Sequence, residues 1–232
     1  MNINEDILKK AAVHARTSSW KVDKRRKCEV LYLDLLDKVK PVATMIVRMP
    51  PSTAWRPETL SGGKEVYVLE GTFQDERGAY PKGSYMRFPP GTRQQGFSDT
   101  GCLLFVKTWQ FKRSDRRLVN IDAAASPVYR PYARSGVSVQ PVFGDDREDV
   151  RLEHWSANHR MAINQINGLE LLVLNGQIHE PSITYKQYSW LRIPPNQSVN
   201  LIVGDIPARV LIKESHLVHA VPGRPALKVG TA

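Results

Sequence analysis

The stretch from Gly63 to Pro90, GKEVYVLEGTFQDERGAYPKGSYMRFPP, decides how this chain of 232 residues folds. The same pattern returns 105 residues later, from Gly168 to Pro195, as GLELLVLNGQIHEPSITYKQYSWLRIPP. Aligned without a gap, ten of the 28 paired positions are identical, including the glycines that open each stretch and the Pro-Pro that closes it. A match of this extent predicts two copies of one structural unit in a single chain.

Short apolar runs punctuated by Gly and Pro surround the repeated stretch. They are rich in β-branched and aromatic residues and recur about every ten residues, which is typical of an antiparallel β-sandwich or barrel. We expect strands over residues 42–49, 65–70, 84–88 and 102–111, with Gly71 as a turn after the second and residues 72–75 as a continuing strand. Residues 30–33 fit a strand or a helix, and residues 5–15 are compatible with one short helix.

The repeat also predicts the domain organisation, because each copy has the size of a small domain. We place a polar N-terminal segment at 1–27, the first barrel at 28–125, a linker at 126–149, the second barrel at 150–220 and a loose tail at 221–232. The linker prediction rests on runs of Asp, Gly, Pro and Arg without apolar periodicity.

The net charge of +10 is the one unusual total of the composition. Basic runs at 21–27 and 112–117 carry no helix-turn-helix, zinc-finger or RNA-recognition signature, so we interpret them as solvated faces and do not expect nucleic-acid binding. Apolar runs are too short to span a bilayer, and the N-terminus does not resemble a secretory signal. The two cysteines have no motif spacing, so we expect reduced thiols in a cytoplasmic protein.

The segments GGKEVYVLEG at 62–71, YPKGSY at 80–85, RFPPG at 87–91 and GCLLFVK at 101–107 resemble the ChrR-like cupins, the cupin half of an anti-sigma factor. The resemblance covers most of residues 1–217 and is weaker in the second copy. It implies an all-β chain of two tandem jelly-roll barrels, a bicupin. Cupins usually hold one metal ion with three histidines and a glutamate.

The spacing of the cupin motifs survives in this sequence, but the usual ligands do not. Counting within the motifs puts the four ligand positions of the first copy at Glu58, Leu60, Lys64 and Gln94. In the second copy they fall at Ile163, Gln165, Leu169 and Val199. Transition metals need imidazole, thiolate or carboxylate donors, so we expect no bound metal, with a divalent ion such as zinc or iron on unusual ligands as the alternative.

The first copy nevertheless keeps a cluster of polar residues where the metal would lie. We expect Glu58, Lys64 and Gln94 to point together into the barrel, with the Lys64 ammonium paired to Glu58, because an unpaired buried ammonium tends to lose its proton. Arg56 and Arg93 flank these positions and are predicted to make the entrance cationic. The alternative is that Glu58 and Lys64 form only a structural pair, and we interpret the second pocket as filled core.

Further candidates are weaker. The six histidines show no spacing that repeats between the copies, so we expect ordinary surface or core residues, with a non-standard site at His154, His159 or His179 left open. Arg87 and Arg192 occupy equivalent places and are interpreted as sheet-face ion pairs.

Three functions follow from these residues and from the resemblance. The first is a metal-free bicupin that binds a small ligand, an anion among the possibilities, or a protein partner. The second is a mononuclear metal dioxygenase or isomerase with unusual ligands. The third is an anti-sigma-factor-like regulator, although we find no match in the sequence to the separate zinc-binding helical domain of ChrR. Exposed sheet edges also favour a homodimer.

Overall fold

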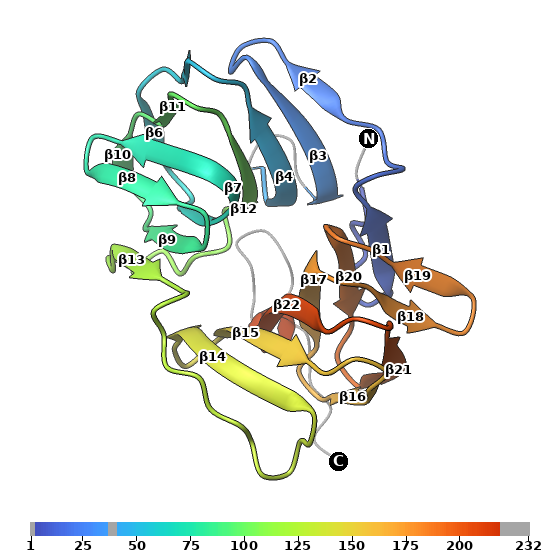
Figure 1. Ribbon diagram of the computed structural model, residues 1–232. Helices are drawn as coiled ribbons and strands as arrows, with labels where there is room; N and C mark the ends of the chain where they lie inside the picture. The colour runs from blue at the N-terminus through green and yellow to red at the C-terminus, as the bar shows by residue number, and fades with distance from the viewer. Residues whose placement is uncertain (1–2, 37–40, 219–232) are drawn as a thin grey trace. The chain divides into compact units, whose positions relative to one another are not determined.

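The computed structural model describes residues 3–36 and 41–218, apart from the side chain of Gln165 (Figure 1). The predicted tail at 221–232 and His219 lie outside the described residues. The chain forms two compact units, one from Met1–Glu5 and Ser19–Ala124 and the other from Asp6–Ser18 and Ala125–Ala232. Both are built from antiparallel strands, and the described residues contain no α-helix, so the all-β prediction is confirmed.

The first unit is built on one large antiparallel sheet. Its main path runs in the order β13 (Val119–Asp122), β9 (Ser84–Phe88), β7 (Lys64–Asp75), β12 (Cys102–Thr108), β4 (Ala43–Met49), β3 (Cys28–Leu35) and β2 (Lys21–Asp23). Shorter strands extend it or form a separate pair, namely β5 (Thr53–Ala54), β8 (Gly78–Pro81), β11 (Phe97–Ser98), β6 (Glu58–Leu60) and β10 (Thr92–Gln94). Residues 30–33 are therefore strand, and the predicted strand at 102–111 ends early, at Thr108.

Gly71 does not make the turn that the sequence predicts. It lies inside β7, where the pairing with β12 shifts register between Leu103 and Leu104. A bulge bends a strand without ending it, and the φ of +68° at Gly71 suits glycine at that bend. β7 therefore continues to Asp75, which adds a polar residue to the same strand that carries Lys64.

The second unit repeats this plan with two antiparallel sheets. One contains β1 (Ala11–His14), β20 (Ser189–Ile193), β17 (Leu169–Asn175), β22 (Ala208–Glu214), β15 (Asp149–Trp155) and β14 (Val137–Gly144), in that order. The other contains β16 (Arg160–Gln165), β21 (Gln197–Val203), β18 (Ile178–Glu180) and β19 (Ile183–Tyr185), followed by a short 3₁₀ turn at His216–Val218.

Registers show that the two copies are structurally equivalent. Glu65 of β7 faces Arg87 of β9, and Glu170 of β17 faces Arg192 of β20. The Arg87 guanidinium lies 3.4 Å from Glu65, which confirms the sheet-face ion pair. Arg192 donates to the backbone oxygen of Asp6, within the second unit.

The N-terminal segment differs from the sequence expectation. Residues 11–14 form β1, which pairs with β20 at the edge of a sheet, so the helix considered for residues 5–15 is wrong. His14 stacks on Tyr185 with ring centroids 5.5 Å apart, and Lys10 forms an ion pair with Glu180. These long-range contacts outweigh the local helical pattern, which is a weak preference.

The stretch read as a linker also contains a strand. β14 buries Val137, Val139 and Val142 and pairs with β15, with a register shift between Pro141 and Phe143. Proline is tolerated at bulges and on edge strands because no ladder N–H is needed there. The prolines and charges of residues 126–149 made an edge strand look like a loop.

Two cores result. The first holds Val68, Phe73, Met86 and Phe88 among its least exposed members. The second is built around Trp155, Leu171, Tyr185 and Val210, all at most 1% exposed. Among the described residues, no helix is long and apolar enough to cross a membrane.

Deleting residues 1–18 should loosen the second unit, because β20 then loses β1 and presents an unpaired edge. Amide hydrogen exchange at residues 189–193 is expected to accelerate at least about tenfold. Deleting only residues 1–5, which precede β1 and belong to the first unit, is the matched control. Unchanged exchange in the longer deletion would show that β1 contributes little to this sheet.

Candidate functional site

Three strands of the first unit bring together the residues that the sequence singles out. Glu58 of β6 and Gln94 of β10 are direct cross-strand partners, and Lys64 is the first residue of β7. Lys64 is 7% exposed and Gln94 is 1% exposed. Buried polar groups of this kind need partners, since transfer from water is otherwise unfavourable.

The Lys64 ammonium has two partners in this cluster. Its Nζ donates to Glu58 Oε1 at 3.1 Å and to Gln94 Oε1 at 3.1 Å. The expected pairing of Lys64 with Glu58 is therefore present. An ammonium has three N–H donors, so one donor is left after these two bonds. Lys64 Nζ also lies 5.3 Å from the centre of the Trp55 ring.

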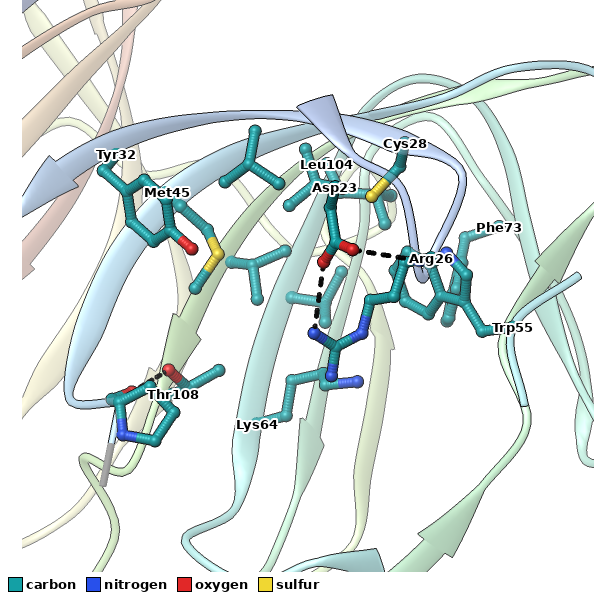
Figure 2. Close-up of a pocket in the computed structure, with 15 residues that line it drawn as sticks. Asp23, Arg26, Cys28, Tyr32, Met45, Trp55, Lys64, Phe73, Leu104 and Thr108 are labelled. Atoms are coloured by element: carbon teal, nitrogen blue, oxygen red, sulfur yellow. Dashed lines mark hydrogen bonds and ion pairs between the residues drawn. The ribbon is translucent and has the colours of Figure 1, made fainter. Parts of the chain in front are cut away.

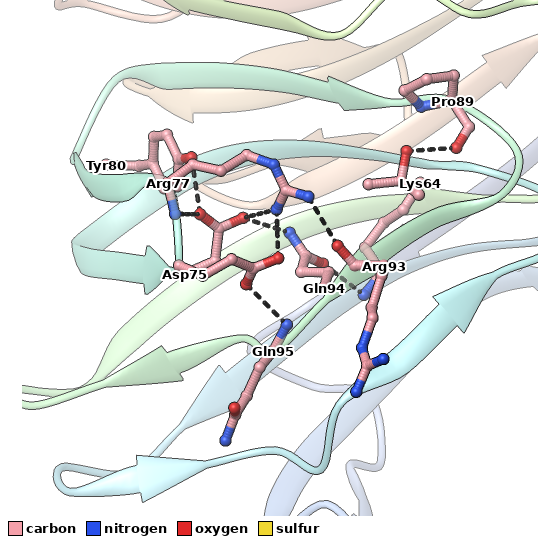
Figure 3. Close-up of polar contacts among 10 residues, drawn as sticks. Lys64, Asp75, Arg77, Tyr80, Pro89, Arg93, Gln94 and Gln95 are labelled. Carbon is pink, nitrogen blue, oxygen red and sulfur yellow. Dashed lines mark hydrogen bonds and ion pairs between the residues drawn. The ribbon is translucent and has the colours of Figure 1, made fainter.

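A second layer of hydrogen bonds holds Gln94 in one orientation (Figure 3). Gln94 Nε2 donates to Asp75 Oδ2 at 3.0 Å, and Tyr80 Oη donates to Asp75 Oδ1 at 2.9 Å. Because a carboxylate only accepts, Asp75 selects the amide nitrogen of Gln94 and turns its oxygen toward Lys64. Arg77 completes this layer with an ion pair to Asp75 at 3.2 Å.

The cation beside the pair is Arg26, which sequence reasoning missed. It follows β2 in the turn to β3, donates to Glu58 Oε2 at 2.7 Å and lies 3.5 Å from Asp23. Figure 2 shows its guanidinium next to the Lys64 side chain. Arg56 and Arg93, which the sequence places at the entrance, are both exposed and do not line the cavity.

An apolar cavity of about 120 Å³ adjoins this cluster inside the first unit (Figure 2). Its walls include Val30, Met45, Val66 and Leu104, and Lys64 is one of its few charged lining residues. Trp55 also lines it, and within the described part of the chain the Trp55 Nε1–H has no hydrogen-bond partner. The cavity therefore combines apolar walls with the Lys64 amine.

Burial and the neighbouring charges set the direction in which the pKa values of Lys64 and Glu58 shift. Burial lowers the pKa of Lys64, and Arg26 lowers it further, while Glu58 and Asp75 act in the opposite direction. For Glu58, burial raises the pKa, but Lys64 and Arg26 outweigh it and the net pKa is below the ordinary value. Glu58 is therefore the ionised member of the cluster at neutral pH, and Lys64 gives up its proton more easily than a surface lysine.

The donor set does not fit a transition metal. Of the four ligand positions in the first copy, only Glu58 carries a usual donor, and its two oxygens already accept from Lys64 and Arg26. Within residues 3–36 and 41–218, no three His, Cys, Asp or Glu side chains lie close enough together to hold an ion. The alternative site at His154, His159 or His179 has no such group around it.

Three of the four equivalent positions in the second unit carry buried apolar side chains. Ile163 and Val199 are 7% exposed and Leu169 is 1% exposed, and all three belong to the hydrophobic core. The prediction of a filled second pocket is confirmed for these residues. Gln165 is the fourth position, and its side chain lies outside the described atoms.

Comparison with known proteins agrees with this geometry. Residues 8–112 match the family model of the ChrR cupin-like domain. This part of the chain is similar to the ChrR-like cupins. Among curated proteins, none matches the chain in sequence.

Solved structures extend the cupin fold over most of the chain. A candidate dioxygenase from Nostoc punctiforme is 13% identical with a TM-score of 0.72, covering 92% of this chain and 86% of the other. Oxalate decarboxylase from Bacillus subtilis is 10% identical with a TM-score of 0.62, covering 88% and 76%. A cupin 2 conserved barrel protein from Leptotrichia buccalis is 9% identical with a TM-score of 0.59, covering 92% and 99%. At these identities the likeness establishes the fold alone.

The two thiols of the chain should react slowly. Cys28 and Cys102 are free and buried, and burial raises the pKa of each to about 11. At pH 8 the thiolate fraction is then about one thousandth, against about a quarter for an ordinary thiol. Alkylation by iodoacetamide at pH 8 is expected to be about 100-fold slower in the folded protein than in guanidinium, and to accelerate with rising pH. Equal rates would contradict the buried, protonated state.

Proposed function

We propose that the first unit binds a small, mainly apolar molecule that carries one oxygen acceptor, a carboxylate or a carbonyl. The observation that carries the proposal is the apolar cavity of about 120 Å³ with the Lys64 amine on its wall. Most ligand sites combine apolar walls with a few polar groups that fix the ligand's orientation. Here Lys64 is the donor that an acceptor oxygen would meet.

The size of the cavity limits the ligand. An engineered apolar cavity of about 150 Å³ in another protein holds one benzene molecule, so this one suits a ligand of about six non-hydrogen atoms. Carboxylates with three or four carbons and aldehydes with three to five carbons meet that limit. The charges of Arg26, Lys64, Asp23 and Glu58 balance one another, which favours a ligand with one polar group over a multiply charged anion.

The donor atoms at the ligand positions of the first unit do not support a metal-dependent reaction. A dioxygenase or decarboxylase of the usual cupin kind needs a coordinated ion, and the positions that would coordinate it are Glu58, Leu60, Lys64 and Gln94. Lys64 and Gln94 are already bonded to each other, and Leu60 has no donor atom. Binding is the role that these side chains support without a further component.

Ligand-observed NMR tests this proposal with butyrate, butyramide and butanol as probes. We expect butyrate and butyramide to bind, and the Lys64→Met variant to bind each at least about tenfold more weakly, since a desolvated hydrogen-bond partner is lost. Lys82→Met is the matched control, because Lys82 is exposed in the same unit. Absence of binding by all three probes, or equal affinities of the two variants, would overturn the proposal.

A further inference from the structure

The hydrogen bonds around Lys64 accommodate its neutral amine form as well as the ammonium. A neutral amine has two N–H donors and one lone pair, whereas both protein partners of Lys64 Nζ, Glu58 Oε1 and Gln94 Oε1, are acceptors. The bond from Gln94 Nε2 to Asp75 prevents Gln94 from turning its amide nitrogen toward Lys64. In the neutral form, the two N–H groups of Lys64 donate to these two acceptors. The lone pair of the nitrogen is then available to a ligand in the cavity that Lys64 lines.

A lysine that loses its proton normally leaves a neighbouring carboxylate without a cationic partner. Arg26 removes this cost. Its guanidinium donates to the second oxygen of Glu58 at 2.7 Å, so Glu58 keeps a cationic partner when Lys64 has lost its proton. A second cation and an apolar pocket are the two features that activate a lysine as a nucleophile. The charged and titratable groups around Lys64 come from four elements and comprise Asp23, Arg26, Cys28, Tyr32, Glu58 and Asp75.

From this arrangement we infer that Lys64 forms a reversible imine with a small aldehyde held in the cavity of the first unit. The inference rests on the proposed binding function and assigns its ligand to the carbonyl class. The lysine nitrogen attacks the carbonyl carbon, a C–N bond forms and the C=O double bond becomes a single bond. The oxygen then leaves as water with both protons of the amine, so the step needs no oxidant, reductant or metal.

Glu58 is the group that can carry these protons. Its Oε1 lies 3.1 Å from Lys64 Nζ, within the range for direct proton transfer. It accepts a proton from the nitrogen after attack, passes it to the carbonyl oxygen, and repeats this when the hydroxyl leaves. The resulting imine nitrogen, when protonated, retains one N–H for the bond to Glu58.

Reductive trapping of the full chain tests the inference. The protein is incubated at neutral pH with butanal and sodium cyanoborohydride, and the butylated lysines are located by peptide mass spectrometry. We expect Lys64 to be labelled at least about tenfold faster than the exposed Lys82, because surface lysines are mostly protonated at this pH. Labelling that is evenly spread over the exposed lysines would overturn the inference.

Two further arms remove the remaining ambiguities. Butyramide, which cannot form an imine, should protect Lys64 from labelling in the unmodified protein, and this measurement needs no variant that could fail to fold. Glu58→Gln should slow labelling of Lys64 at least about tenfold while butyramide still binds, as expected when a proton carrier is removed. Labelling at the unmodified rate would exclude Glu58 from that role.

The outcomes separate this inference from the proposed function. Butyramide binding without selective labelling of Lys64 would refute the imine and leave the binding site intact. Loss of both binding and labelling would refute the two together. Selective labelling that butyramide does not prevent would show that Lys64 reacts outside the cavity, which contradicts the placement argued here.

Discussion

Replacing Gly71 with alanine is expected to destabilise the first unit strongly. A Cβ at this position would lie 2.1 Å from the Gly101 carbonyl oxygen and 3.0 Å from Cys102 Cα, and both are backbone atoms that cannot rotate away. The φ of +68° adds strain for any residue with a side chain. Together these effects should destabilise the unit by at least about 3 kcal/mol, measured by urea unfolding of the whole chain.

Gly91→Ala is the control that isolates the steric clash. Its φ is +89°, yet no heavy atom lies within 4 Å of the added Cβ, so only backbone strain of about 1–2 kcal/mol is expected. Gly176, the equivalent of Gly71 in the second copy, should behave like Gly71, because its Cβ would lie 2.7 Å from the Pro207 carbonyl oxygen. Similar losses for Gly71→Ala and Gly91→Ala would show that the backbone relieves the clash.

The second large effect concerns Glu153, whose side chain is fully buried in the second unit. Arg134 donates to both of its oxygens at 2.8 and 2.6 Å, Arg151 Nε donates at 2.7 Å and Trp155 Nε1 donates at 2.7 Å. Glu153→Gln removes the charge and places an N–H₂ group against these donors. Because Arg151 is then left largely buried without its main partner, a loss of about 3–5 kcal/mol is expected.

The pH dependence gives this prediction a second readout. Burial raises the pKa of Glu153, but the hydrogen bonds and charges of Arg134 and Arg151 lower it more, so its net pKa is below the ordinary value. A depressed pKa contributes stability above the unfolded-state value near 4 and loses it as pH falls through the folded-state value. The stability difference between unmodified protein and Glu153→Gln should therefore be full at pH 7 and shrink in acid.

Asp149→Asn provides the matched comparison for Glu153→Gln. Asp149 contacts the same Arg151 at 2.6 Å, but its side chain is 52% exposed. Water already screens such a pair, so its loss should cost less than about 1 kcal/mol. Equal losses for the two variants would mean that burial does not set the strength of this network.

The internal repeat explains why much of the fold can be predicted from the sequence. Identical residues at equivalent positions mark places where both copies need the same backbone, such as Gly71 and Gly176, each two residues after a register shift, with φ of +68° and +75°. The spacing between motifs also places Glu58, Lys64 and Gln94 together, because strands of fixed register bring fixed positions opposite one another. Periodicity does not reveal sheet edges, and so β1 and β14 were misread.

The parts of the site that sequence reasoning missed come from tertiary structure. Arg26 belongs to a run of charges at 21–27 that looks like any solvated face, and only the turn between β2 and β3 directs it to Glu58. Asp75 lies in a stretch that the sequence predicts as strand, but its bond to Gln94 joins two different strands, and no motif spacing relates the two residues.

The pairing of β1 with β20 has a consequence for how the chain is made. His14 and Ser189, which contact each other in that pair, are 175 residues apart. At roughly 5–20 residues per second, a ribosome needs roughly 9–35 seconds to synthesise the segment between them. During that time the first unit is completed while the strand preceding it has no partner, so a nascent chain stalled before residue 189 should expose residues 11–14 to protease or chaperone.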